Sequence, residues 1–350
     1  MPFWKNQSKT LLGLDIGTSS IKAVQLLREG AQIQLRRAQM AAIAPEIVVD
    51  GAITDADGLA EAITRLLGAK AKKQRTAAAV SGHSVFVRPI VMPAMSDAEL
   101  ATAIQAEAVQ HVPFPIEEVN LDYQVLDFRE GGQMEVLLVA AKKEKVINTT
   151  DALTRAGLQP EIMDHDPLAL ANCYEYNYQP APDTAAALLH VGASQTHFNV
   201  LRGAVPCFTR DISAGGNQYT DALQKEFALS FDEAEAVKLG RSNAVSEPKR
   251  REVIQSITEM LRRELRKMLD FFHADNDRVA IGRLYLSGGG AAVPGLQEML
   301  QQEMSVPVEG LDPFRRIRAL KNEPVGMELR QIAPRMAVAV GLALREFEDL

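Results

Sequence analysis

Residues 11–26, LLGLDIGTSSIKAVQL, decide how the rest of this chain is interpreted. They predict an apolar strand, a tight Gly-Thr-Ser-Ser turn and a second strand, with an aspartate before the turn and a lysine after it. A glycine lets backbone amides approach anionic oxygens, hydroxyls and an ammonium add hydrogen bonds, and a carboxylate can orient a divalent ion. The turn therefore indicates either a phosphate-binding hairpin or an ordinary strand connection, because such turns also arise by chance. The residues that could hold a phosphate are Asp15, Gly17, Thr18, Ser19, Ser20 and Lys22.

Composition limits the classes of protein to which this chain can belong. A length of 350 residues predicts about two or three domains, and 47% apolar with 24% charged residues is typical of a globular protein. A net charge of −7 argues against general binding to nucleic acid or to an anionic membrane. Cys173 and Cys207 are far apart and fit reduced thiols. Since neither a signal-type start nor an apolar run of about 20 residues occurs, we expect a cytoplasmic protein.

A second hairpin of the same kind is expected within residues 185–210, AAALLHVGASQTHFNVLRGAVPCFTR. It again predicts strand, glycine turn, strand and strand, so the chain is expected to consist of two duplicated βββαβα halves. Further on, the apolar strand RLYL precedes a glycine turn that would let a purine and its ribose approach the backbone. The candidate residues in these two turns are Gly192, Ala193, Ser194, Thr196, Gly288, Gly289 and Gly290.

A different unit is predicted between the halves, at residues 86–163. Its first helix starts at Ser96, with Glu99 completing a capping box, and stops at two prolines. Strands LDYQVLDF and MEVLLVAAKK, a second helix and another strand follow, giving an αββαβ order. Before it, RTAAAVSGHSVFVRPIVMP predicts one continuous strand, and the chain is expected to close with a helix over residues 333–347.

In this order the motifs resemble those of the actin-like ATPase superfamily, which includes actin, sugar kinases, heat-shock chaperones and FtsA. LDIGTSSIK is similar to phosphate motif one, LHVGASQTHF to phosphate motif two and LYLSGGGAAVPGL to the adenosine motif. The resemblance implies ATP and Mg²⁺ as cofactors, with Asp15 and Asp166 beside the metal. Asp166 precedes Pro167 and fits a helix N-cap equally well. The segments DISAGGNQYTDAL and DEAEAVKLG resemble those flanking adenosine in FtsA, which adds Gly215, Gly216, Glu235 and Lys238.

The inserted unit resembles the 1C subdomain of FtsA, and ELATAIQAEAVQHVPFPIEEVNLDYQVLDF is most similar to the PilM family of type IV pilus assembly proteins. That resemblance implies a scaffold on the inner face of the inner membrane. Its groove between 1A and 1C would bind the cytoplasmic N-terminal peptide of the membrane protein PilN, so the chain would contact the membrane only through this partner. Self-association is possible, and no binding to nucleic acid is expected. The implied subdomains are 1A (1–85 and 164–184), 1C (86–163), 2A (185–214 and 284–350) and 2B (215–283).

One residue departs from the superfamily pattern. Phosphate motif two normally has an aspartate where this chain has His190, and a neutral imidazole does not hold Mg²⁺, which prefers oxygen ligands. We therefore expect ATP binding with slow or absent hydrolysis. His197 is expected to be an ordinary strand residue.

Two alternatives remain open at this stage. An FtsA-like cell-division filament protein would carry an amphipathic C-terminal helix, whereas the last residues here, LREFEDL, are acidic. A small-molecule kinase of the same superfamily would need a catalytic base and sugar-binding insertions, and neither is visible in the sequence.

Overall fold

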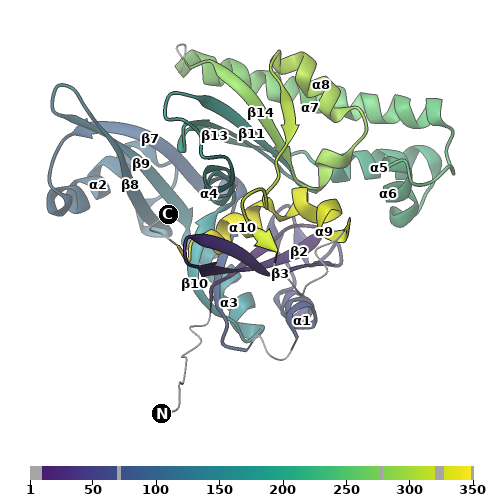
Figure 1. The fold of residues 1–350 in the computed structure, drawn as a ribbon, viewed down its shortest axis with the longest axis horizontal. Helices are drawn as coiled ribbons and strands as arrows, with labels where there is room; N and C mark the ends of the chain where they lie inside the picture. The colour runs from purple at the N-terminus through teal and green to yellow at the C-terminus, as the bar shows by residue number, and fades with distance from the viewer. Residues whose placement is uncertain (1–9, 69–71, 276–278, 320–326, 348–350) are drawn as a thin grey trace.

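The computed structural model describes residues 10–68, 72–275, 279–319 and 327–347. Figure 1 shows two large sheets, one above the other, with helices between and outside them and a smaller sheet to one side. The last three residues of the acidic C-terminal segment lie outside the described residues.

The first large sheet has the strand order β10-β6-β1-β2-β3-β16. Three consecutive strands form an antiparallel meander, and β6 and β10 run parallel to β1. The strands are β1 (Leu12–Ile16), β2 (Ser20–Glu29), β3 (Gln32–Ala42), β6 (Arg75–Val80), β10 (Gln159–His165) and β16 (Arg318–Ala319).

The second large sheet repeats this plan with the order β13-β12-β11-β14-β15. It again begins with an antiparallel meander, and β14 then runs parallel to β11. Two large sheets built in this way confirm the predicted actin-like α/β fold of two duplicated halves. The strands are β11 (Ala185–Val191), β12 (Thr196–Arg202), β13 (Val205–Ile212), β14 (Ile281–Ser287) and β15 (Val308–Gly310).

Two helices, α4 (Asp166–Tyr178) and α10 (Ala337–Leu344), fill the space between the two large sheets. The residues of α10 are apolar all round and buried, as expected for a helix enclosed by other elements. The close approach of α10 to α4 requires a glycine, because a Cβ on Gly341 would lie 1.7 Å from the carbonyl oxygen of Ala169. The two halves thus share one apolar core along α4 and α10.

Further helices cover the outer faces. Below the first sheet lie α1 (Ala56–Leu67) and α3 (Lys143–Arg155), and the short β4 (Val48–Val49) and β5 (Ala52–Ile53) pair beside them. Around the second sheet lie α5 (Gly216–Phe227), α6 (Phe231–Lys238), α7 (Glu247–Asp275) and α8 (Leu296–Met304), and α9 (Met327–Ile332) leads into α10. The long α7 packs one apolar stripe, including Leu261, Leu265 and Leu269, against the second sheet.

The smaller sheet, called here the insertion sheet, has the order β7-β9-β8 and carries α2 on one face. Its elements are β7 (Val85–Pro93), α2 (Asp97–His111), β8 (Val119–Arg129) and β9 (Gln133–Lys142). Leu100, Ile104 and Ala108 of α2 pack onto this sheet. The predicted capping box is confirmed, because Ser96 accepts from the amide of Glu99 and the Glu99 carboxylate accepts from the amide of Ser96.

Three expectations about the elements were wrong in detail. The stretch predicted as one strand is divided at Gly82, whose φ of 76° suits a turn, so that β6 joins the first sheet and β7 joins the insertion sheet. The insertion sheet and its helix have the order βαββ. The final helix is shorter than predicted, because a 3₁₀ turn at Ala333–Met336 precedes α10.

Two elements of the predicted 1C range pack elsewhere. Helix α3 contacts α1, and β10 pairs with β6 in the first sheet. The insertion sheet itself ends at Lys142. We therefore propose that the boundary between 1C and the returning part of 1A lies near Lys142.

Candidate functional site

The two predicted phosphate turns, residues 17–20 and 192–195, meet between the halves of the molecule. Each follows the carboxyl end of a strand, β1 in one half and β11 in the other, where ligands of α/β sheets bind. The hydroxyl oxygens of Thr18 and Ser194 are 2.7 Å apart and form a hydrogen bond from one half to the other. This hydrogen bond brings the two turns together at the interface between the halves.

The turns share a backbone arrangement that suits an anion. Gly17 donates to the carbonyl of Ser20 at 3.1 Å, and Gly192 donates to the carbonyl of Gln195 at 2.8 Å. In each turn two amides remain that donate to no described residue, those of residues 18 and 19 and of residues 193 and 194. Successive free amides of this kind form a concave anion-binding surface, so the turns fit a phosphate chain.

In the first hairpin, Asp15 and Lys22 lie opposite one another across β1 and β2. The Lys22 ammonium nitrogen is 3.1 Å from the Asp15 carboxylate, and both side chains are about nine-tenths buried. A Cβ on Gly17 would lie 2.8 Å from this ammonium nitrogen, so the lysine reaches over the turn and a side chain at residue 17 would displace it. The arrangement places a fixed cation beside the free amides.

In the second hairpin the corresponding positions are occupied by two histidines. The spacing is the same, since DIGTSSIK and HVGASQTH both place the paired residues seven positions apart, and His190 faces His197 across β11 and β12. His190 Nδ1 lies 3.0 Å from the hydroxyl of Ser287. Burial, together with the nearby His197 and Lys22, holds the pKa of His190 well below its usual value, so this imidazole is neutral.

His197 is placed between two carboxylates. Its Nδ1 lies 2.6 Å from Asp211 of β13, and its Nε2 lies 3.7 Å from Asp166 at the start of α4. Burial alone would lower the pKa of His197, but Asp211, Asp166 and the charge of Asp15 raise it to about 9. The pKa of Asp211 is correspondingly lowered to about 2, since the attraction of His197 outweighs burial.

Asp166 is not the N-cap of α4, which was one of the two sequence interpretations. His165 occupies the N-cap, Asp166 is the first helical residue, and its carboxylate points toward His197. Burial raises the pKa of Asp166, and the charge of His197 offsets part of that effect. Among the described residues the buried Nδ1 of His165 has no hydrogen-bond partner, and burial lowers the pKa of this histidine to about 4.

The remaining glycine turns pack tightly around the same region. A Cβ on Gly215 would lie 2.6 Å from the carbonyl oxygen of Gly192, and one on Gly288 would lie 2.3 Å from that of Val191. The amide of Gly216, at the start of α5, donates to Gly192. Gly216 and Gly290 are also close, since a Cβ on Gly216 would lie 4.0 Å from the Cα of Gly290. These backbones form a cradle from which side chains are excluded.

Glu235 and Lys238 of α6 form a second polar group beside this cradle. The Lys238 ammonium donates to the carbonyl of Gly216 at 3.2 Å and to the hydroxyl of Thr220 at 2.9 Å, and it also pairs with Glu235. Burial lowers the pKa of Lys238, and Glu235 partly offsets this. The FtsA-like segment thus contacts the second phosphate turn through Gly216. The hydroxyl of Thr196, a candidate residue of the second turn, donates to the carbonyl oxygen of Ala214 at 2.7 Å.

Several residues around the turns were missed from the sequence. Asp211 binds His197 and also accepts from the amide of Gly82 at 2.9 Å, so it joins β13 to the loop after β6. The side chain of Arg335 lies near Gly289, because a Cβ there would be 3.5 Å from its Nε. Lys145 of α3 is near enough to Asp166 for that charge to act on it. Asp211 opens the segment DISAGGNQYTDAL and Arg335 lies in the predicted final helix, but their approach to the turns depends on long-range packing that no local spacing indicates, as does that of Lys145.

The carboxylates do not form a ready site for a divalent ion. Asp15 faces Lys22 and Asp166 faces His197, while His190 occupies the place of a third carboxylate. Within the described residues, no group of three or more His, Cys, Asp or Glu side chains could hold a metal ion. The phosphate turns therefore fit an anionic ligand, and a Mg²⁺ ion there would have to be held by phosphate oxygens and water together with Asp15 or Asp166.

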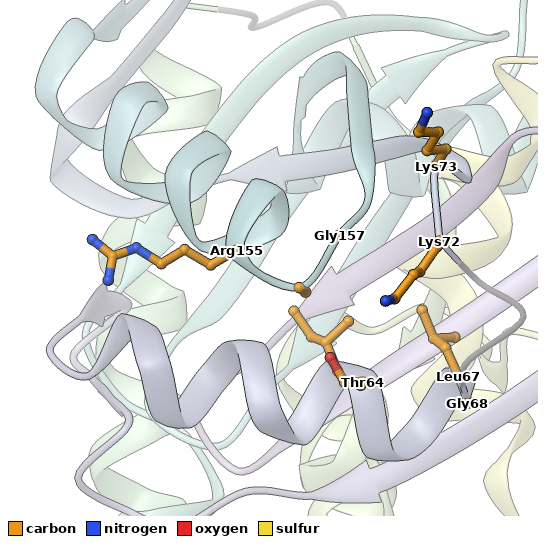
Figure 2. A pocket seen from close by; sticks show the side chains of 9 residues that line it. Thr64, Leu67, Gly68, Lys72, Lys73, Arg155 and Gly157 are labelled. Carbon is orange, nitrogen blue, oxygen red and sulfur yellow. The ribbon is translucent and has the colours of Figure 1, made fainter.

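A separate pocket lies at the opposite end of the first sheet. It has a volume of about 390 Å³ and is lined by the ends of α1 and α3 and by residues 72 and 73, which precede β6. Lys72 extends across it, whereas Lys73 and Arg155 point away (Figure 2). Since it adjoins the amino ends of β6 and β10, this pocket shares no residue with the site between the turns.

Comparison with known proteins decides the family. The family model described as "Type IV pilus assembly protein PilM" matches residues 13–347. The chain belongs to the PilM family. A solved structure entitled "PilM-PilN type IV pilus biogenesis complex" is similar with a TM-score of 0.85 and 32% identity, over 98% of this chain and 99% of the other.

Two more distant proteins are also similar to this chain. Cell division protein FtsA of Streptococcus pneumoniae is 25% identical over 342 residues, covering 85% of this chain and 74% of FtsA. MreB5 of Spiroplasma citri, solved with ADP, has a TM-score of 0.56 at 13% identity over 97% of this chain and 96% of its own, and it shows the fold alone. Within the described residues of this chain, no helix is long and apolar enough to cross a bilayer.

Proposed function

We propose that this PilM-family chain is a nucleotide-binding scaffold of type IV pilus assembly, or of a related secretion or competence system. The observation that carries the proposal is the match to the PilM–PilN complex over nearly the full length of both chains. By this proposal the chain acts as a peripheral protein on the cytoplasmic face of the inner membrane, reaching the membrane only through its partner.

The nucleotide would be ATP, bound between the two phosphate turns. Support comes from the four free turn amides, the buried ammonium of Lys22 and the glycine cradle at residues 215–216 and 288–290. Glu235 and Lys238 would face the adenosine side. Since His190 leaves no carboxylate at the position that normally serves the attacking water, hydrolysis is expected to be slow or absent.

The partner would be the cytoplasmic N-terminal peptide of a PilN-like inner-membrane protein. Strand β8 lies at one end of the insertion sheet and β10 at one end of the first sheet. Asp122 of β8 is near enough to Asp164 of β10 for its charge to raise the pKa of that carboxyl, so a peptide at the β8 edge would run toward β10. An extended peptide can add to such an edge through backbone hydrogen bonds.

A peptide titration tests this function. The full chain is titrated with a fluorescent N-terminal peptide of a PilN-like protein from the same organism, with and without ATP. We expect a dissociation constant of about 50 μM or tighter. Failure to bind at several hundred micromolar would contradict the scaffold function.

Two matched variants test whether the peptide binds beside β8. Asp122 and Asp127 are both exposed aspartates of β8, and each accepts a hydrogen bond from the amide of the following residue. Asp122→Arg, beside β10, is expected to weaken peptide binding at least about tenfold, a loss of roughly 1.4 kcal/mol. Asp127→Arg, nearer the hairpin tip, should leave it unchanged.

A further inference from the structure

The loop at residues 311–317, LDPFRRI, joins β15 of the second sheet to β16 of the first sheet. It lies against the far end of α4, where the amide of Asp312 donates to the hydroxyl of Tyr178 at 2.9 Å. Helix α4 begins at Asp166 beside the phosphate turns, so this end is roughly 18 Å away from them. Strands β16 and β10 also lie at opposite ends of the first sheet. The loop is therefore separate from both the nucleotide site and the peptide edge.

Hydrogen bonds to α4 hold this loop in one position. The buried Asn177 donates from its Nδ2 to the carbonyl of Pro313 at 2.9 Å, and its Oδ1 accepts from the amide of Arg316 at 3.0 Å. The guanidinium of Arg316 donates to the carbonyl of Tyr176 at 3.0 Å. The first and last residues of the loop are buried in the core that the two halves share. The side chains that the loop presents are thus preorganised.

Two consecutive arginines of the loop stack on half-buried tyrosines of α4. The guanidinium carbon of Arg315 lies 4.7 Å from the ring centre of Tyr178, and that of Arg316 lies 5.4 Å from the ring centre of Tyr176. Burial raises the pKa of Tyr176, and the charges of Arg316 and of Arg28 in β2 partly offset this, which places Arg28 near the same ring. A ring beneath a guanidinium fixes its plane and leaves its edge exposed. We call Arg28, Arg315, Arg316 and the two tyrosines the arginine surface.

The cations of the arginine surface are not neutralised by the chain itself. Arg28, Arg315 and Arg316 are exposed, and none of them forms an ion pair with another described residue. Asp312, the carboxylate of the loop, accepts instead from the amide of Phe314. A guanidinium has five N–H donors, and Arg28 and Arg316 each use one on a backbone carbonyl. Most donors of this surface are therefore available to a ligand.

We propose that the arginine surface binds an acidic segment of a protein partner, whose carboxylates pair with the exposed edges of the guanidinium groups. Guanidinium edges match carboxylates with two parallel hydrogen bonds. The net charge of the chain is −7, so an acidic segment is repelled elsewhere and is directed to this surface. The inference goes beyond the proposed function, since neither ATP nor the PilN-like peptide takes part in it.

An anionic membrane fits this surface less well than an acidic protein segment does. Recognition of anionic lipid usually needs about 4–8 basic residues or apolar side chains that enter the bilayer. Here the tyrosine rings lie beneath arginines, and among the described residues the large apolar side chains that are exposed all lie outside this loop. A chain with a net negative charge would also be repelled by such a membrane.

Fluorescence anisotropy of labelled octaglutamate, titrated with the full chain, tests the proposal. At about 50 mM salt we expect a dissociation constant of about 100 μM or tighter, and weaker binding at about 300 mM salt because exposed charges are screened. Octaglutamine is the uncharged control and should not bind. Absence of octaglutamate binding at about 1 mM, or equal binding of both peptides, would overturn the proposal.

Matched variants locate the binding to these arginines. Arg315→Gln together with Arg316→Gln should weaken octaglutamate binding about tenfold or more. Lys249→Gln together with Arg263→Gln removes the same charge from exposed positions of α7 and should change it less than about twofold. Arg28→Gln leaves the loop untouched and should weaken binding about threefold. Circular dichroism establishes that each variant is folded. If neither Arg28→Gln nor the folded Arg315→Gln, Arg316→Gln variant weakens binding, the proposal is wrong.

Two further measurements separate this surface from the alternatives. Sedimentation with vesicles of phosphatidylserine and phosphatidylcholine should show no bound chain, and binding that the Arg315→Gln, Arg316→Gln variant loses would overturn the choice of a protein partner. Equilibrium dialysis with labelled ATP and titration with the PilN-like peptide should be unchanged in this variant. Failure of this proposal is therefore distinguishable from failure of the proposed function.

Discussion

At the scale of single residues, the site depends on charges that are buried in pairs. His197 contacts Asp211 and Asp166, and Lys22 contacts Asp15, so these side chains compensate one another away from water. Removing one member of such a pair leaves its partner buried and unpaired, which costs more free energy than the pair contributes. The protonation of these side chains should therefore change the free energy of unfolding of the whole chain.

Stability should fall as the pH rises past neutrality because of His197. Its pKa is about 9 in the folded chain, above its ordinary value of 6.5. A raised pKa means that the stabilisation is complete below about pH 6.5 and is lost as the pH approaches 9. Urea unfolding should show the free energy of unfolding decreasing by about 1–3 kcal/mol across this window.

The comparison with His197→Gln isolates this effect. His165 and His190 have lowered pKa values, so their protonation destabilises the fold below about pH 6.5. Within pH 6.5–9 the variant should therefore show a clearly shallower decline than the unchanged chain. Equal slopes would mean that His197 is not charged in the folded state.

The glycine cradle gives a second prediction at this scale. Gly288 has a φ of 88°, and a Cβ there would also lie 2.3 Å from the carbonyl oxygen of Val191. Gly295 has a similar φ of 85° but open space around its Cβ position. Gly288→Ala should therefore destabilise the chain by about 2–4 kcal/mol and abolish ATP binding.

Gly295→Ala is the matched control for Gly288→Ala, because it keeps the backbone strain without the clash. It should cost only about 1 kcal/mol and leave ATP binding intact. Thermal unfolding and ATP dialysis measure both effects. Equal effects of the two substitutions would show that close packing against Val191 is unimportant.

At the scale of elements, local signals predicted the hairpins and the helix start at Ser96, because turn glycines and capping residues act within a few positions. The division between β6 and β7 was missed, because the apolar pattern continues across Gly82 and only the sheets that each strand joins separate them. The placement of α3 and β10 with the first sheet depends on long-range pairing in the same way. For the same reason Lys145 and Arg335 could not be assigned to the site, and the pairing of Asp211 with His197 became visible only through the register of β12 and β13.

Two helices with the same cap allow the proposed sites for ATP and for the PilN-like peptide to be separated. Ser96 begins α2 of the insertion sheet and Ser230 begins α6, each with a complete capping box. Either Ser→Ala substitution should cost about 1 kcal/mol of stability. Because α6 carries Glu235 and Lys238, Ser230→Ala should weaken ATP binding and leave peptide binding unchanged, whereas Ser96→Ala should do the opposite.

Dialysis with ATP and titration with the peptide, applied to both variants, measure this crossed effect. Circular dichroism establishes that each remains folded. An equal loss of ATP binding and of peptide binding in both variants would mean that the substitutions act through global stability alone.

At the scale of the whole molecule, the two halves meet through shared helices and through the turns. Helices α4 and α10 form a common apolar core, whereas the Thr18–Ser194 hydrogen bond joins the turns directly. A ligand bound to both turns would therefore contact both halves while leaving the core undisturbed. The insertion sheet extends from the first half, and the partner peptide is proposed to bind beside it.

Hydrogen–deuterium exchange of the full chain, alone, with ATP and with the PilN-like peptide, tests the central claim most directly. Amides in the turns at residues 17–20 and 192–195 are expected to be protected by ATP. Amides of β8 and β10 are expected to be protected by the peptide. Unchanged exchange in the turns with saturating ATP, together with unchanged exchange in β8 and β10 with saturating peptide, would contradict the account of this chain as a nucleotide-binding scaffold.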